Sequence, residues 1–260
     1  MGRRQKKCLI QIKFEFTYIY TIVMIRKIIP LIFLLNLNFI FSQENEIGLL
    51  AGGSNYIGDV GPTTYIHPFS YNSSANFVFG IVYKRNFNER ISARAKFNYS
   101  KIGSSDNWPN SVDYRKQRGK FFQNNIAEFG IGLDFNFLEF DVFSSSLQTT
   151  PYLSSGISFF RYDALRYPIG DKKAIKYGDA SSISIPITIG YKIKPSKNFI
   201  FAFEITANHS YSDNLDGSYP GDKQKLSSDN FGSSLSRDWY VFSGFSITYL
   251  FGKRGCYCPN

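Results

Sequence analysis

The stretch RDWYVFSGFSITYLFGKRGCYCPN, residues 237–260, places apolar and aromatic side chains at alternate positions. One face of it carries Trp239, Val241, Ser243, Phe245, Ile247, Tyr249 and Phe251. The other face is mostly small and polar, although Phe242 and Leu250 interrupt it. Successive side chains of a strand point to opposite faces, so this pattern predicts a β-strand with one apolar side.

The same alternation recurs through the body of the chain, where a helical period is almost absent. The expected strands are residues 46–56, 76–87, 90–102, 123–138, 150–163, 181–194, 198–212 and the C-terminal stretch. Most of them exceed the usual strand length of about five or six residues. They match the roughly nine to eleven residues that a tilted strand needs to cross a bilayer.

The connections between these strands differ in length. The long ones, rich in Gly, Pro, Asn, Asp and Ser, are residues 57–75, 103–122, 164–180 and 213–236. The short ones lie near 88–89 and 195–197, with one of middle size at 139–149. Transmembrane barrels have long extracellular loops and short periplasmic turns. We therefore predict an all-β fold, an eight-stranded antiparallel up-and-down transmembrane barrel with that arrangement.

A soluble barrel with an oily lumen is the alternative fold. Its outward face would then be the one rich in Gly, Ser and Thr, whereas a soluble surface should carry more Lys and Glu. A closed barrel in lipid satisfies every backbone hydrogen bond and leaves no open edge, which favours the transmembrane version.

The N-terminal segment MIRKIIPLIFLLNLNFIFSQ, residues 24–43, has the three parts of a secretion signal. These are the positive Arg26 and Lys27, an apolar run at 28–41, and the small Ser42 before Gln43. A retained anchor is the alternative, but the run is short for a membrane span.

The signal divides the chain into three parts. We expect Met24 to be the true start and residues 1–42 to be an extension plus signal peptide. The barrel then occupies residues 43–252, and residues 253–260 form a periplasmic tail.

The formal net charge of +10 overstates the positive charge of residues 43–260, because much of it comes from the N-terminal segment. Residues 1–42 hold seven basic residues and one acidic residue, and the remainder holds 23 basic and 19 acidic residues. No aromatic-interleaved basic stripe accompanies this mild excess, so we expect no nucleic-acid partner. The cysteines Cys8, Cys256 and Cys258 leave the body without a disulfide framework.

Catalytic residues are not predicted. The histidines are His67 and His209. By strand alternation, Glu204 and Ser210 face inward and His209 faces outward, so a serine triad fails on geometry. Cys256 and Cys258 lack a second pair of metal ligands, and we predict neither a metal nor another cofactor.

Charged residues recur on the inward faces of the expected strands, namely Arg94, Lys96, Glu128, Asp134 and Glu204. We expect a buried ion network that fixes the shape of the barrel. A narrow conducting pore is the alternative, but the interior of an eight-stranded barrel is filled by side chains.

The C-terminal stretch also supplies candidate contacts with lipid and protein. Aromatic rings favour membrane interfaces, where we expect Trp239, Tyr249 and Phe251. The candidate partner-binding residues of the tail are Lys253, Arg254, Cys256, Tyr257 and Cys258.

Specific segments resemble a known family. They are GLLAGGSNYIGDVGPTTYI (48–66), RKQRGKFFQNNIAEFGIGLDFNF (115–137), TPYLSSGISFFRYD (150–163) and DWYVFSGFSITYLFG (238–252). Together they resemble the PorG-type outer-membrane barrel of the type IX secretion system of Bacteroidetes-like bacteria. The resemblance implies an outer-membrane accessory barrel that ties a periplasmic ring, a PorK-like lipoprotein and its PorN-like partner, to the membrane. It carries over no catalytic residues.

The expected function is therefore a non-enzymatic outer-membrane barrel whose partners are outer-membrane lipid and the periplasmic ring proteins. The tail and the turn at 139–149 are the candidate ring contacts. A general surface-binding, adhesin-like barrel without a secretion role is the alternative, and an outer-membrane lipid hydrolase is the third possibility.

Overall fold

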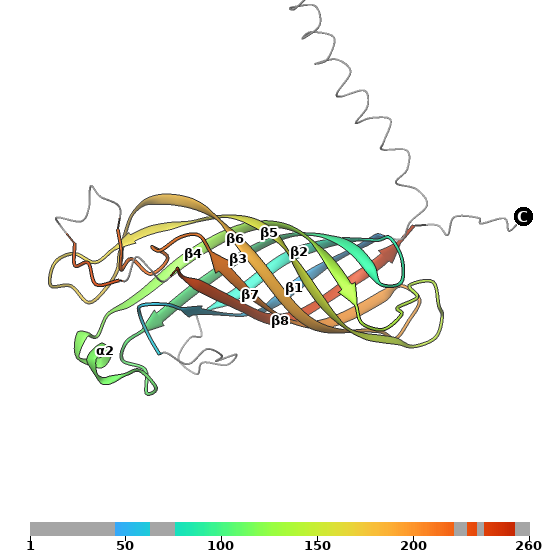
Figure 1. Cartoon of the computed structure of the whole chain (residues 1–260), viewed down its shortest axis with the longest axis horizontal. Helices are drawn as coiled ribbons and strands as arrows, with labels where there is room; N and C mark the ends of the chain where they lie inside the picture. Colours follow the sequence, from blue (N-terminus) through green and yellow to red (C-terminus); the bar gives the residue numbers. More distant parts are fainter. Residues whose placement is uncertain (1–44, 63–75, 221–227, 233–236, 253–260) are drawn as a thin grey trace, which may run out of the picture. The chain divides into compact units, whose positions relative to one another are not determined.

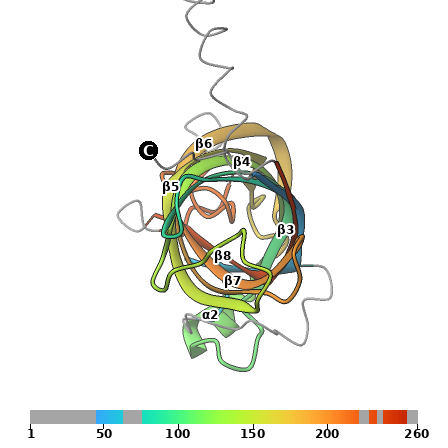
Figure 2. The same cartoon turned by 90° about the vertical axis from the view of Figure 1, so that its right-hand side faces the viewer.

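The computed structural model describes residues 45–62, 76–220, 228–232 and 237–252. In this part of the chain eight strands form one closed antiparallel barrel in chain order (Figures 1 and 2). They are β1 (Asn45–Ile57), β2 (Phe77–Asn86), β3 (Ile91–Ser105), β4 (Phe121–Asn136), β5 (Gln148–Arg166), β6 (Ile175–Lys194), β7 (Phe199–Ser210) and β8 (Trp239–Phe251). The prediction of an eight-stranded up-and-down barrel is confirmed. The signal segment, its cut site and the tail 253–260 lie outside the described residues.

The last strand, β8, has the alternating sequence from which the fold was predicted. It closes the barrel by pairing with β1. The pairing runs from Asn45 opposite Phe251 to Ile57 opposite Trp239. Because each strand pairs with two neighbours, the sheet has no open edge in the described part of the chain, and the backbone groups of the wall bond to one another.

Side chains alternate around the wall between an apolar exterior and a polar interior. On the outside, Phe245 and Ile189 are 67% and 66% exposed. On the inside, Ser184 and Asn208 are fully buried. A belt of large exposed apolar side chains is stable in lipid rather than in water, and the interior is not the oily lumen of a lipid carrier.

The connections lie at two ends of the barrel (Figure 1). We call the end with the described residues 58–62, 76, 106–120, 167–174, 211–220, 228–232 and 237–238 the loop end. The opposite end, with residues 87–90, 137–147 and 195–198, is the turn end. A short helix, α2 (Asp113–Arg118), lies within the connection 106–120 and ends at Gly119, whose φ of 63° is left-handed. None of the helices in the described ranges is long and apolar enough to cross a membrane.

The connection between β5 and β6 differs from the sequence prediction. We expected a long loop at 164–180, but β5 continues to Arg166 and β6 begins at Ile175. The connection 167–174 is therefore shorter than 137–147 at the turn end, against the expected rule. Ion pairs hold the extra strand length together: Lys176 lies 2.5 Å from Asp163, and Arg161 lies 2.9 Å from Asp179.

Apolar side chains close both ends of the barrel. At the loop end, Phe242 of β8 packs with Phe122, Phe160 and the loop residue Leu215 in one buried cluster. At the turn end, Leu250 of β8 forms a second cluster with Phe140, Val142 and Ile200. The two residues that interrupt the polar face of β8 thus take part in the two end closures.

Candidate functional site

The first part of the interior network is centred on Arg94 of β3. Its guanidinium lies 2.8 Å from Asp134 of the neighbouring strand β4 and 3.0 Å from Glu204 of β7. Lys84 of β2 adds a contact of 3.0 Å to Asp134. The Tyr152 hydroxyl of β5 donates to Glu204 at 2.5 Å. All five side chains lie inside the wall, so the group links five strands across the lumen.

The second part is centred on Glu128 of β4. Its carboxylate lies 3.1 Å from the Nζ of Lys96. It accepts hydrogen bonds from the Tyr240 hydroxyl at 2.6 Å and from the Ser158 hydroxyl at 3.3 Å. A buried carboxylate needs such partners, because an unpaired charge in a low dielectric is costly.

The structure therefore brings the predicted interior residues together as two neighbouring ion groups. Sequence reasoning missed Lys84, Glu46 and Lys192. Their positions on the inward faces of β2, β1 and β6 follow the same alternation, so the signal was present in the sequence. Glu46 is fully buried and accepts from Asn86 at 2.8 Å and from Thr248 at 2.9 Å.

Lys192 differs from the other interior cations. It is fully buried, and its Nζ has no hydrogen-bond partner in the part of the chain that the structure describes. The Nζ lies 4.4 Å from the ring centroid of Phe140 and 5.7 Å from that of Tyr152. An aromatic face attracts a cation, so Phe140 both closes the turn end and contacts a buried charge.

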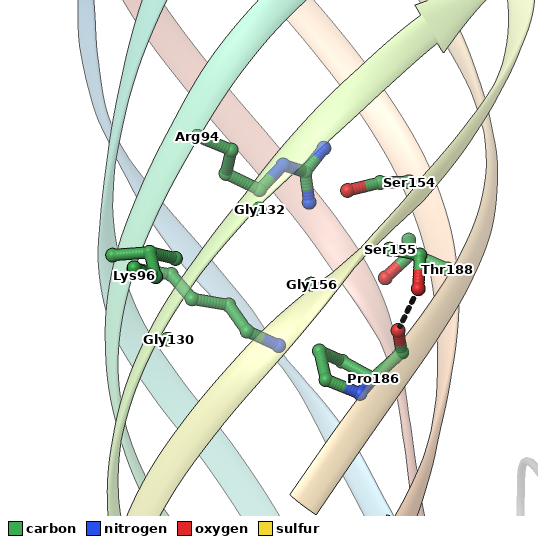
Figure 3. Close-up of a pocket in the computed structure, with 10 residues that line it drawn as sticks. Arg94, Lys96, Gly130, Gly132, Ser154, Ser155, Gly156, Pro186 and Thr188 are labelled. Atoms are coloured by element: carbon green, nitrogen blue, oxygen red, sulfur yellow. Dashed lines mark hydrogen bonds between the residues drawn. The ribbon is translucent and has the colours of Figure 1, made fainter.

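Glycines make room for the long side chains of the interior. Figure 3 shows a small cavity between β4, β5 and β6 with Arg94 and Lys96 on one side. A Cβ on Gly130 would lie 3.1 Å from the Cε of Lys96, so glycine there accommodates the lysine stem. Pro186 of β6 also lines this cavity. It has no N–H to donate to a neighbouring strand, but its carbonyl accepts from the Ser155 hydroxyl of β5 at 3.0 Å.

Ionic contacts also tie together the connections at the loop end. Arg118 of α2 lies 2.8 Å from Asp106, and Lys120 lies 2.6 Å from Asp229. Arg115 donates to the carbonyls of Gly58 and Gly61 at 3.0 and 2.7 Å. Residues from three connections therefore support one another beyond the barrel wall.

Three carboxyl groups at the loop end lie in a less favourable environment. Burial raises the pKa of Asp216 to about 6, and burial with the nearby Asp59 raises the pKa of Asp213 to about 6. Burial, followed by the charge of Asp216, raises the pKa of Asp238 well above its ordinary value. The Asp238 carboxylate accepts from the Tyr56 hydroxyl at 2.5 Å.

The predicted interface aromatics lie at the two ends of β8. Trp239 at the loop end and Tyr249 and Phe251 at the turn end are all exposed on the outer face. The ring of His209 packs against Trp239 at a centroid distance of 4.7 Å.

The residues of the imagined serine triad are not brought together. Glu204 and Ser210 are buried in the interior, whereas His209 lies on the outer face beside Trp239. His67 and the tail residues Lys253 to Cys258 lie outside the described residues.

The fold is similar to solved outer-membrane proteins. Ail, the attachment invasion locus protein of Yersinia pestis, shares 11% identity at a TM-score of 0.40, over 81% of this chain and 99% of that one. The outer membrane protein OprG from Pseudomonas aeruginosa shares 9% at 0.40, over 82% and 98%. A major outer membrane protein from Thermus thermophilus shares 8% at 0.42, over 81% and 100%.

A search of curated proteins finds no match. The likeness to solved structures concerns the fold alone, because the identities are low. A model of a protein family matches residues 25–260 of this chain, which is more of the chain than these solved structures cover. This barrel therefore belongs to the family described as a domain of unknown function, DUF6089.

Proposed function

We propose that the chain is a non-enzymatic outer-membrane subunit of the type IX protein secretion machinery, which anchors the periplasmic lipoprotein ring to the membrane. The observation that carries this proposal is the filled lumen. Side chains such as Arg94 cross the interior, and apolar clusters with Phe242 and Leu250 close both ends. A barrel of this kind offers no path for an exported protein, so it acts through its surfaces.

The resemblance of residues 48–66 and 238–252 to PorG-type barrels supplies the secretion role. The exposed apolar belt supplies the membrane anchor, with outer-membrane lipid as the first partner. In this orientation the loop end is extracellular and the turn end is periplasmic, which is the usual arrangement of such barrels.

The connection 137–147 is the described surface that best suits a ring contact. Phe140 fixes it by inserting into the apolar cluster of the turn end. Leu147 and Phe143 remain 63% and 38% exposed on the same connection. A rigid loop with exposed apolar side chains loses little conformational entropy on binding, which favours a stable protein contact. The tail residues Lys253, Arg254, Cys256, Tyr257 and Cys258 are the second proposed contact.

An affinity pull-down tests the proposal. A tag in the connection 167–174 at the loop end leaves the proposed contact free. Detergent-solubilised outer membranes should then yield a periplasmic lipoprotein ring. Recovery of the barrel alone, together with normal secretion in a deletion strain, would remove the secretion role and leave the fold unchanged.

Paired variants locate the contact. Leu147→Asp should reduce recovery of the ring, because it places a charge in the apolar contact surface. Ile169→Asp is the matched control, since Ile169 is 68% exposed but lies at the loop end. Deletion of residues 254–260 tests the tail, and an unchanged ring yield in that variant would exclude it.

A surface-binding barrel without a secretion role is the second candidate. The mutual support of the loop-end connections through Arg115, Arg118 and Lys120 favours it, because ordered loops make a defined binding surface. A deletion strain separates the candidates. A secretion subunit loses many exported proteins at once, an adhesin loses one attachment phenotype, and a lipid hydrolase, the third candidate, changes lipid composition.

A further inference from the structure

A segment of the connection 211–238 inserts into the loop end of the barrel. We call residues 213–219 the latch. Leu215 is fully buried in the apolar cluster of the loop end. Its carbonyl accepts from the Asn124 side chain at 2.7 Å, and its N–H donates to the Asp238 carboxylate at 2.9 Å. The latch is thus held by β4 on one side and by the start of β8 on the other.

The latch brings two carboxyl groups into this closure. Asp216 is fully buried, and its Oδ1 accepts from the Ser218 N–H at 2.8 Å. Its Oδ2 is buried and has no hydrogen-bond partner among the residues that the structure describes. Both carboxylate oxygens of Asp213 are also buried and have no hydrogen-bond partner among the described residues. Buried carboxylate oxygens without donors are unfavourable when the group is ionised.

Two further carboxyl groups, those of Asp59 and Asp238, lie beside the latch. Asp238 is fully occupied by Tyr56 and by the N–H of Leu215. Asp59, in the connection after β1, accepts from the Ser218 hydroxyl at 3.4 Å. The charge of Asp59 opposes the ionisation of Asp216, and that of Asp216 opposes the ionisation of Asp238.

Few cations compensate these charges. The titratable and charged groups around the latch are Tyr56, Asp59, Asp106, Arg118, Tyr162, Arg166, Tyr167, Tyr177, Arg237 and Asp238. Arg118 is already paired with Asp106 at 2.8 Å, and Arg237 lies 4.3 Å from the ring centroid of Tyr211. In the described ranges no three ligating side chains are arranged to hold a metal ion. Protons are the remaining way to neutralise the cluster.

We propose that the latch is proton-dependent, closing the loop end while Asp213 and Asp216 are protonated and loosening when they ionise. Burial, which raises the pKa of each of these groups from 3.8 to about 6, supports this. Between those two values the closed state binds more protons than an open, hydrated state. Closure is therefore most stable below pH 4 and loses stability as the pH rises through 6.

Hydrogen exchange tests the latch in the full-length protein folded in detergent micelles. The measured quantity is the protection factor of the amides of residues 214–218 at pH 5 and pH 8, corrected for the intrinsic exchange rate. We expect protection to be higher at pH 5 by about tenfold for each linked carboxyl. Equal protection at the two values would overturn the proposal.

Neutral variants assign the effect. Asp216→Asn keeps an oxygen for the Ser218 N–H and removes the charge, so protection at pH 8 should rise by about 100-fold and the pH response should shrink. Asp213→Asn is the second test, on a less buried group, if the first variant does not fold. Asp229→Asn is the matched control, because its carboxylate is paired with Lys120 rather than with the latch.

The proposal fails if both latch variants keep the complete response of the unmodified protein. It also fails if calcium alone, added at pH 8, restores the protection seen at pH 5, because a bound cation would then be the compensating group. Loss of the response in either latch variant, with the response intact in Asp229→Asn, supports it.

Discussion

Asp134 in the lumen and Asp216 in the latch are the same residue type at nearly complete burial, yet their surroundings are opposite. Asp134 is within 3.0 Å of both Arg94 and Lys84. Asp216 has one backbone N–H donor, the hydroxyls of Ser218 and Tyr56, and another carboxyl nearby, but no cation. The Asp134 carboxylate is thus compensated by two cations, whereas the Asp216 carboxyl of the proposed latch depends on protonation. One barrel combines a permanent cross-link with a conditional closure.

The largest expected effect comes from breaking the lumen pairing. Asp134→Asn keeps the shape of the side chain but leaves Lys84 without its ion-pair partner and Arg94 with Glu204 alone. We expect a loss of about 3–5 kcal/mol in the free energy of unfolding. Urea unfolding in phospholipid vesicles measures it, with Asp171→Asn, an exposed carboxyl of the connection 167–174, as the control. A loss no larger than that of the control would show that the Lys84 charge is compensated without Asp134.

The closure of the turn end ranks next. Phe140→Ala removes a fully buried ring and leaves a cavity beside Lys192, so we expect a loss of about 3 kcal/mol. Phe140→Leu separates packing from charge, because it keeps apolar volume and loses the aromatic face. A loss of about 1 kcal/mol in Phe140→Leu measures the cation–π contact, and an unchanged stability would assign the role of Phe140 to packing alone.

The latch variant gives an effect of opposite sign. Asp216→Asn should raise the free energy of unfolding at pH 8 by about 1–3 kcal/mol, since each unit of pKa shift corresponds to about 1.4 kcal/mol. The gain should vanish as the pH falls well below 3.8, where the carboxyl of the unmodified protein is protonated in both states. Unfolding curves at pH 8 and at this lower pH measure this. A stabilisation of equal size at both would assign the effect to hydrogen bonding by the amide.

Alternation was sufficient to predict the barrel, the number of its strands and the inward position of Arg94 and Glu128, because one lipid-facing side fixes the register. It could not reveal which charges pair. Arg94 and Glu204 are 110 residues apart, and only closure of the sheet brings them together. The latch was equally hidden, because the stretch around Leu215 reads as a polar loop and is buried only by tertiary contacts.

The sequence prediction was wrong at the β5–β6 hairpin for a related reason. Residues 176–180 lack alternation because the row of large exposed apolar side chains of β6 runs from Ile183 to Tyr191 and does not include them. Their strand structure depends on cross-strand contacts such as Arg161 with Asp179.

The same hairpin yields the smallest expected effect. Arg161 and Asp179 form an exposed pair at 2.9 Å, and solvent screens such pairs. Asp179→Asn should therefore leave the unfolding midpoint of the barrel unchanged within error while increasing hydrogen exchange in residues 175–180 alone. A destabilisation of the whole barrel comparable with that of Asp134→Asn would mean that the hairpin extension folds as one unit with the membrane-spanning wall. Local loosening would instead separate the wall, held by lipid and lumen charges, from an extension held by its own surface contacts.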